Sequence, residues 1–251
     1  NSQLRGIIEG LADKKPYAAN HTLAAVRKFY NWCVERQLVT ASPVAGISKP
    51  GKEISRDRVL TDDEITALWE TFDGVGWPFG LAFKLLLVTG QRRNEVAQMR
   101  WKDIDTENAL WTLPREATKA DRVHEVPLSP LALEVLQMVP HTGDYIFTTN
   151  GKTPISGFSR AKKRADKLSE ITGWRLHDLR RTVASQMAKL GIAPHVVEKI
   201  LNHSTGQISG VAAVYNRHAY TEEKRNALSI WARRLESLIR SSEDNVVQLN
   251  V

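Results

Sequence analysis

Polar residues suited to phosphate binding and proton transfer are concentrated between residues 176 and 218. His177 precedes Arg180 by three residues, His203 follows in LNHS, and Tyr215 follows in VAAVYNRH. Guanidinium and imidazole groups can meet the charge of a phosphodiester under attack, and a tyrosine hydroxyl can serve as the nucleophile. We therefore expect these side chains to converge on one phosphodiester.

A second arginine, Arg92, lies far upstream in TGQRRNEV and is followed by Glu95. Taken singly, such residues have ordinary structural explanations. A His near a helix end interacts favourably with the helix dipole, and a Tyr beside valines is usually anchored in a core. Their combination favours a shared site. Tyr220, five residues beyond Tyr215, is a second candidate for the nucleophile.

Helical spacing explains how this stretch would bring its polar side chains together. His177 and Arg180 share one face at the start of a predicted helix, where the helix dipole attracts phosphate. A separate apolar stripe would face the core: Leu179, Val183, Met187 and Leu190. Gly191 ends this helix, Pro194 begins the next, and His203 follows directly after it.

Upstream helices would place the first arginine beside this stretch. Residues 61–64, Thr-Asp-Asp-Glu, form a capping box that predicts the start of a helix. A very apolar helix over residues 78–89 ends at Gly90, a typical helix terminator. Arg92 therefore lies just beyond a buried helix, at the start of a short one.

Short alternating runs predict a sheet, so the expected fold class is mainly α with a small three-stranded antiparallel sheet. The runs are 102–105, 110–113 and 123–126. Ser156 is the predicted cap of a strongly basic helix over residues 157–169. Thr221 is the predicted cap of a last helix, whose apolar seam would be Leu228, Trp231, Leu235 and Leu238.

The N-terminal residues predict a separate helical unit. Within residues 1–40 one helical stripe would contain Leu23, Val26, Phe29, Tyr30 and Cys33. Polar residues to about residue 58 then indicate a linker. Two helices are too few for an independent core, so residues 1–56 are predicted to end a larger domain and residues 57–251 to form the second. The chain does not begin with Met, and we expect it to be a fragment.

The composition favours a folded protein with a polyanionic partner. The 251 residues are 42% hydrophobic and carry a net charge of +7. The single cysteine, Cys33, cannot form a disulfide within the chain, which suits a reducing cytosol. No run of eighteen apolar residues and no signal-peptide pattern is found. No carboxylates have the spacing of a metal site, so a metal-dependent nuclease is not expected.

Four motifs in this order resemble the catalytic domain of the tyrosine recombinases, the phage integrase family. TGQRRNEV is similar to the first arginine motif, and LHDLRRT to the His-x-x-Arg motif. LNHS is similar to the second histidine motif, with Asn202 where glycine is commoner. YNRHAYTEEKRNAL resembles the tyrosine motif of integrases from prophages and genomic islands. Residues 1–56 resemble the end of the family's helical core-binding domain plus a linker.

The resemblance implies a DNA breaking and rejoining reaction that uses neither metal nor cofactor. Tyr215 would form a 3′-phosphotyrosyl bond, with His177 taking its proton. Lys119, in the hairpin ATKADRVHEVPL between the second and third strands, would protonate the leaving 5′ oxygen. Glu95 would orient the donors that meet the developing charge, which are Arg92, Arg180 and His203.

DNA contacts are expected from residues 151–190, which contain ten basic residues against three acidic ones. Most would meet phosphates without reading the base sequence. The predicted DNA-binding residues are Lys152, Arg160, Lys162, Lys163, Arg164, Arg175 and Arg181. The resemblance also implies double-stranded attachment sites, a homotetramer on DNA that is mostly monomeric when free, and room for a DNA-bending accessory protein. It implies no membrane partner and a place in the bacterial cytoplasm, at the nucleoid.

Three alternatives stay open. A type IB topoisomerase-like enzyme would share the chemistry but act as a monomer, and a DNA-binding protein of the same fold could have lost catalysis. The last helix could pack on its own domain, whereas the family tends to donate its C-terminal segment to a neighbouring copy. The apolar residues that could dock there follow a polar run: Val246, Val247 and Leu249.

Overall fold

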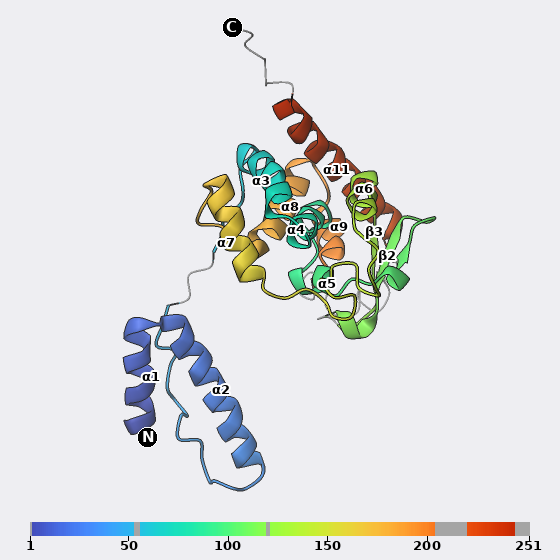
Figure 1. Cartoon of the computed structure of the whole chain (residues 1–251). Helices are drawn as coiled ribbons and strands as arrows, with labels where there is room; N and C mark the ends of the chain where they lie inside the picture. Colours follow the sequence, from blue (N-terminus) through green and yellow to red (C-terminus); the bar gives the residue numbers. More distant parts are fainter. Residues whose placement is uncertain (1, 53–55, 119–120, 204–219, 244–251) are drawn as a thin grey trace. The chain divides into compact units, whose positions relative to one another are not determined.

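The computed structural model of the chain describes residues 2–52, 56–118, 121–203 and 220–243. It divides into two compact units, Asn1–Asp57 and Arg58–Val251 (Figure 1). Each unit has its own hydrophobic core.

Two helices form the first unit, α1 (Ser2–Lys14) and α2 (Pro16–Glu35). Pro16 suits the first turn of α2, where a missing N–H costs nothing. Four buried residues make the small core: Ile8, Leu23, Val44 and Ile47. Cys33 is buried as predicted, but Phe29 is 56% exposed and stacks on Trp32 instead of packing beside Cys33. The predicted apolar stripe was therefore too wide by one aromatic residue.

A buried helix, α4 (Phe79–Thr89), lies at the centre of the second unit. It is packed against α3 (Asp62–Val75) and against α6 (Pro130–Gln137), which begins after the cap Ser129. The predicted capping box of α3 is present, with Thr61 and Glu64 each accepting from the other's backbone N–H. Gly90 ends α4 at a positive φ of 65°, and a Cβ there would lie 3.0 Å from Val183. Glycine is thus required both by the backbone and by the packing.

Three short strands form the antiparallel sheet in the order β1–β2–β3. They are β1 (Ile104–Asp105), β2 (Leu110–Leu113) and β3 (His124–Pro127), and Leu113 pairs with His124 where the β2–β3 hairpin begins. The predicted class, mainly α with a small three-stranded antiparallel sheet, is confirmed. The first predicted run begins instead as a 3₁₀ turn, η1 (Trp101–Asp103), and a second such turn, η2 (Arg115–Ala117), lies in the hairpin.

Four further helices lie near the predicted site residues in the sequence. They are α5 (Arg93–Ala97), α7 (Phe158–Ser169), α8 (Leu176–Lys189) and α9 (Pro194–Ile200). The predicted cap Ser156 was wrong: α7 begins after Gly157, whose φ of 91° turns the chain into the helix without a side-chain cap. In α8, the Asp178 carboxylate accepts from the backbone N–H of Arg175.

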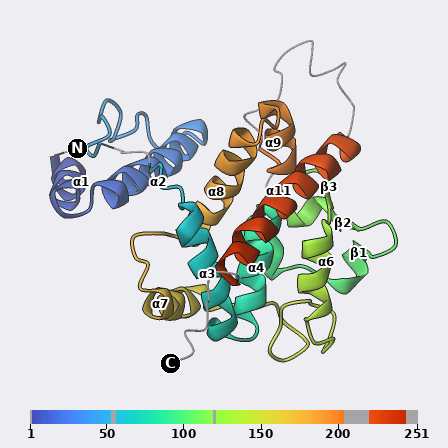
Figure 2. The same ribbon diagram turned by 90° about the horizontal axis from the view of Figure 1, so that it is seen from above.

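The last helix, α11 (Thr221–Glu243), packs on its own unit, running beside α4 and α9 (Figure 2). Trp231 is fully buried, and its indole N–H donates to the Leu87 carbonyl of α4 over 3.0 Å. Arg234 pairs with Asp62 at 2.6 Å. Thr221, the predicted cap, is the first residue of the helix, and its hydroxyl donates to the Glu125 carboxylate over 3.3 Å. The segment with Val246, Val247 and Leu249 lies outside the described residues.

Among the helices that the structure describes, none combines the length and apolar character that crossing a bilayer requires.

Candidate active site

A cleft of about 1110 Å³ collects several of the predicted site residues on the second unit. Its walls come from α5, the η2 turn, α7 and the start of α8. Arg92, His177 and Arg180 all line it, together with Glu95. Three predicted DNA-binding residues line it as well: Lys162, Lys163 and Arg175. The cleft is therefore strongly cationic, which suits an anionic ligand.

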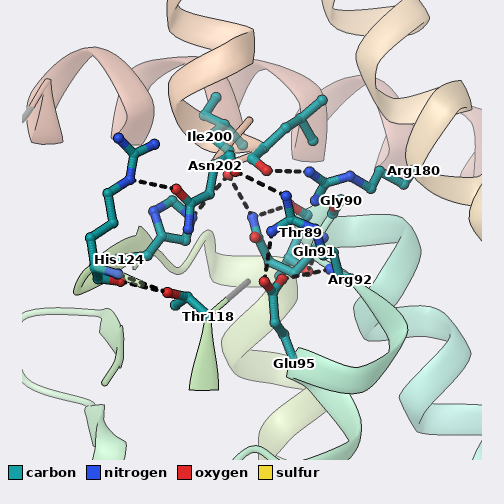
Figure 3. Close-up of polar contacts among 12 residues, drawn as sticks. Thr89, Gly90, Gln91, Arg92, Glu95, Thr118, His124, Arg180, Ile200 and Asn202 are labelled. Atoms are coloured by element: carbon teal, nitrogen blue, oxygen red, sulfur yellow. Dashed lines mark hydrogen bonds and ion pairs between the residues drawn. The ribbon is translucent and has the colours of Figure 1, made fainter. Parts of the chain in front are cut away.

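The C-terminal end of α9 is the anchor for both arginines (Figure 3). The last carbonyls of a helix lack partners within the helix and carry the negative end of its dipole. Here three consecutive carbonyls, those of residues 200–202, accept side-chain hydrogen bonds from other elements. A helix terminus that would otherwise need water or caps thus holds two cationic groups of the cleft, those of Arg92 and Arg180.

Arg180 is almost fully buried, with 3% of its surface exposed. Its guanidinium donates to the Gly90 carbonyl at 2.8 Å and to the Leu201 carbonyl. Burial and the nearby charge of Arg92 lower the pKa of Arg180 to about 10, so it stays charged at neutral pH. These two bonds use two of the five N–H donors of the guanidinium, and the residue lines the cleft.

Arg92 is held from two sides at the start of α5. One terminal nitrogen pairs with the Glu95 carboxylate at 2.7 Å, and the other donates to the Asn202 carbonyl at 2.9 Å. Glu95 is buried and also accepts from the backbone N–H of Arg92 at 2.8 Å. The carboxylate thus fixes both the backbone and the side chain of the arginine.

His177 lies at the N-terminal end of α8 on the wall of the cleft. Burial of the ring lowers its pKa below the ordinary value, and the charges of Arg180 and Arg181 lower the pKa further. Near neutral pH the ring is therefore uncharged, the form that can accept a proton. Arg181 itself pairs with Asp178 at 3.0 Å.

His203 follows the anchored end of α9 but is not among the residues that line the cleft. Its Nδ1 lies 2.9 Å from the Glu198 carboxylate, and its backbone N–H donates to the Glu198 carbonyl. This contact fixes the ring through one nitrogen. His203 is close enough to His177 to contribute, after burial and the nearby arginines, to the lowering of the His177 pKa.

Two predicted catalytic residues, Lys119 and Tyr215, lie outside the described residues. Tyr220, the alternative nucleophile, is described and does not line the cleft. Its ring packs edge-on to His195 at 5.6 Å, and the Lys199 ammonium lies 5.2 Å from its centre. Of the other predicted DNA-binding residues, Lys152, Arg160 and Arg164 are exposed outside the cleft.

The sequence reasoning missed several polar residues around the anchor. Gln91 and His124 both donate to the Ile200 carbonyl, at 3.0 Å each. Burial lowers the pKa of His124 to about 3, so this ring is neutral and structural. Arg122, in the β2–β3 hairpin, donates to the Asn202 side chain at 2.8 Å. Gln91 lies inside the arginine motif TGQRRNEV, so the sequence could have indicated that it belongs to the site. No local sequence pattern indicates that Arg122 and His124 reach the end of α9.

Fold and cleft together define a catalytic domain of the tyrosine-recombinase type. The chain belongs to the phage integrase family, whose sequence profile matches residues 58–222.

Relatives of this family match most of the chain. Prophage integrase IntZ of Escherichia coli K12 is 29% identical over 234 residues, covering 89% of this chain and 57% of that protein. The shufflon-specific DNA recombinase of Escherichia coli is 32% identical over 184 residues, covering 70% of this chain and 46% of that protein. The chain spans about half the length of these curated relatives.

Solved structures share the fold at lower identity. Residues 75–356 of lambda integrase, crystallised as a dimer bound to a COC′ core site, give a TM-score of 0.66 at 22% identity, covering 83% of this chain and 80% of that one. A lambda integrase tetramer bound to a Holliday junction gives a TM-score of 0.67 at 21% identity, covering 83% of this chain and 65% of that one.

Among the described residues, no three His, Cys, Asp or Glu side chains gather as they would around a metal ion.

Proposed function

We propose that the chain is the catalytic part of a site-specific DNA recombinase of the integrase type, which cleaves and rejoins DNA through a 3′-phosphotyrosyl intermediate. The observation that carries this proposal is the pair of anchored arginines, Arg92 and Arg180, on a cationic cleft beside a neutral His177. The relatives that match the chain are integrases and recombinases. The first unit, residues 1–57, is proposed to belong to a core-binding domain.

The proposed reaction begins with attack of the Tyr215 oxygen on phosphorus. His177 takes the phenolic proton, which the tyrosine, with an ordinary pKa of about 10, does not lose unaided at neutral pH. The bond from phosphorus to the 5′ oxygen breaks, and Lys119 protonates that oxygen. Religation reverses these steps, so the phosphodiester energy is kept and no nucleotide cofactor is used.

Electrostatic stabilisation is proposed to be the main contribution of the cleft. Attack adds negative charge to the nonbridging oxygens, and donors that are already held in place cost no reorganisation when that charge develops. A guanidinium offers two parallel N–H groups to such oxygens, which an ammonium cannot. Arg92 and Arg180 are proposed to act in this way, with Glu95 as a positioning residue and His203 as a further donor.

Duplex DNA is the proposed partner, gripped by the cationic cleft and by the basic surface of α7. Four strands are exchanged in a recombination event, so four active sites must meet, and a homotetramer on DNA is proposed. The lambda integrase tetramer, which shares the fold, supports this assembly. Free protein is proposed to be mostly monomeric, working in the bacterial cytoplasm with or without a DNA-bending accessory protein.

A nicked suicide substrate tests this function. Cleavage releases a short fragment that carries the 5′-hydroxyl, and without that fragment religation cannot occur and the covalent complex is trapped. We expect the wild-type chain to become linked to DNA in the presence of EDTA. Tyr215→Phe should bind DNA and form no link, while Tyr220→Phe should still form it. Trapping by Tyr215→Phe but not by Tyr220→Phe would move the nucleophile to Tyr220. Absence of trapping by the wild type in EDTA, restored by magnesium, would refute the proposed chemistry.

A further inference from the structure

The anchored end of α9 receives hydrogen bonds from two directions. From the cleft side come Gln91, Arg92 and Arg180. From the β2–β3 hairpin come His124, which bonds the Ile200 carbonyl, and Arg122. The hairpin and the phosphate-binding arginines therefore share one three-residue anchor, although they are far apart in sequence.

The two directions meet at the Ile200 carbonyl, which accepts from Gln91 and His124, and at Asn202 (Figure 3). Its side-chain oxygen accepts from Nε of Arg122 at 2.8 Å, and its main-chain carbonyl accepts from Arg92 at 2.9 Å. The residue is 1% exposed. The hairpin and Arg92 are thus hydrogen-bonded to the side chain and to the main chain of one buried residue.

The backbone of Asn202 explains why this position needs external support. Its φ is 48°, a left-handed conformation that residues other than glycine adopt at a cost, asparagine less than most. Glycine, the commoner residue in this motif of the family, would fit the backbone but offer no acceptor to Arg122. Asparagine keeps the turn and adds the link to the hairpin.

Arg122 is itself fixed within the hairpin. The Thr118 hydroxyl donates to the Arg122 carbonyl at 2.7 Å and accepts from the Arg122 backbone N–H at 3.2 Å. Thr118 is buried and lines the cleft. The bond from Arg122 to Asn202 thus connects the backbone beside Thr118, a residue of the cleft wall, to the end of α9.

We propose that Arg122 and Asn202 are positioning residues that set the Arg92 guanidinium in the cleft. This inference rests on the proposed function, because its effect is on the cleavage step. Neither residue contacts the phosphate in this scheme. Arg122 holds the Asn202 side chain, Asn202 presents its carbonyl, and that carbonyl aligns Arg92 with the nonbridging oxygens.

Two substitutions remove the link with little other change. Arg122→Ala removes the donor, and Asn202→Gly removes the acceptor while suiting the left-handed backbone. Arg115→Ala is the matched control, because it removes the same charge from the same hairpin. Arg115 pairs only with the exposed Asp121 among the described residues, at 2.8 Å, and does not reach α9.

Single-turnover cleavage of the suicide substrate, at saturating protein, is the measurement. We expect Arg122→Ala and Asn202→Gly to slow cleavage by about 10- to 100-fold, since a displacement of about 1 Å at a reacting centre can have such an effect. Arg115→Ala should stay within about twofold. The double variant Arg122→Ala/Asn202→Gly should be no slower than the slower single variant, because both remove one interaction.

The Arg92→Lys background separates positioning from general stability. Trapping is irreversible, so slow rates remain measurable over hours. If Arg122 acts through Arg92, adding Arg122→Ala to Arg92→Lys should change the cleavage rate little. The melting temperature of the Arg122→Ala variant should fall only slightly. A full additional loss in that background, or Arg122→Ala cleaving like Arg115→Ala, would overturn the inference. Failure of the wild type to trap DNA would instead refute the proposed function.

Discussion

The centre of the cleft and the surface of α7 hold positive charge in different ways. At the centre, Arg180 is buried and bonded to two main-chain carbonyls. On α7, Lys163 and Arg164 are exposed, and Lys162 pairs with Asp166 within the helix. Carbonyl anchors fix a guanidinium before any ligand arrives, whereas exposed side chains must lose rotamer freedom on binding. The centre is therefore built for chemistry and the surface of α7 for adaptable contacts.

The largest loss of cleavage rate should come from substituting the buried Arg180. In Arg180→Lys a single ammonium cannot hold the Gly90 and Leu201 carbonyls and still offer two donors to a phosphate. We expect suicide-substrate cleavage to slow by about 10²- to 10³-fold, the loss typical of one transition-state donor. Arg160→Lys, on the exposed face of α7, is the control and should cleave at nearly the wild-type rate. Equal losses in the two variants would contradict the comparison.

Burial of His124, which bonds the Ile200 carbonyl, also predicts a dependence of stability on pH. The pKa of His124 is about 3 in the folded protein and about 6.5 when unfolded, so only the unfolded state binds the proton between these values. The free energy of unfolding should fall by about 1.4 kcal/mol for each pH unit below about 6.5. His124→Gln keeps an N–H donor for the Ile200 carbonyl but does not titrate. Denaturant unfolding at pH 7 and pH 5 should show a smaller decrease in this variant, and parallel decreases would exclude His124 as the cause.

His177 lines the cleft, and nearby charges influence its pKa. Because burial lowers the pKa of His177 and the charges of Arg180 and Arg181 lower it further, the acidic limb of the cleavage rate should lie below the ordinary histidine range, with activity lost as the ring gains a proton. Arg181→Gln removes one of these charges and should move that limb to higher pH. A pH–rate profile under single-turnover conditions measures the shift. An unmoved limb would mean that another group controls it.

The smallest effect should come from the surface of α7. Lys163→Ala removes one exposed charge that lines the cleft. We expect DNA affinity to fall a few-fold and the slope of log affinity against log salt to decrease by about 1, as for loss of one phosphate contact. Cleavage at saturating protein should be unchanged. Lys102→Ala, in the η1 turn away from the lining residues, is the matched control for charge and should leave the salt slope unaltered.

Elements with a strong local signal could be predicted from the sequence. The capping box at Thr61, the stop at Gly90 and the buried seam of α11 all follow from side-chain type and helical spacing. Phe29 could not be placed, because a stripe at helical period does not show how wide the neighbouring surface is. The prediction of Ser156 as the cap of α7 was wrong, because Gly157 precedes the helix in a left-handed backbone conformation without a side-chain cap.

The candidate site was predictable in its residue types but not in its supports. Arg92, His177 and Arg180 stand in recognisable motifs, and the structure brings all three to one cleft. Their anchors are main-chain carbonyls, and a carbonyl has no sequence signature. The contact between Arg122 and Asn202 joins residues eighty positions apart, so nothing local announces it.

The burial of α11 has a consequence for the kinetics of subunit exchange. Leu228, Trp231 and Leu235 are at most 2% exposed, and each belongs to the core of its own unit. A second copy could accept this helix only after the donor had opened its core, so exchange of the whole helix would proceed at the rate of that opening. Opening of the donor core would be a first-order step, so the half-time of exchange would not depend on the protein concentration.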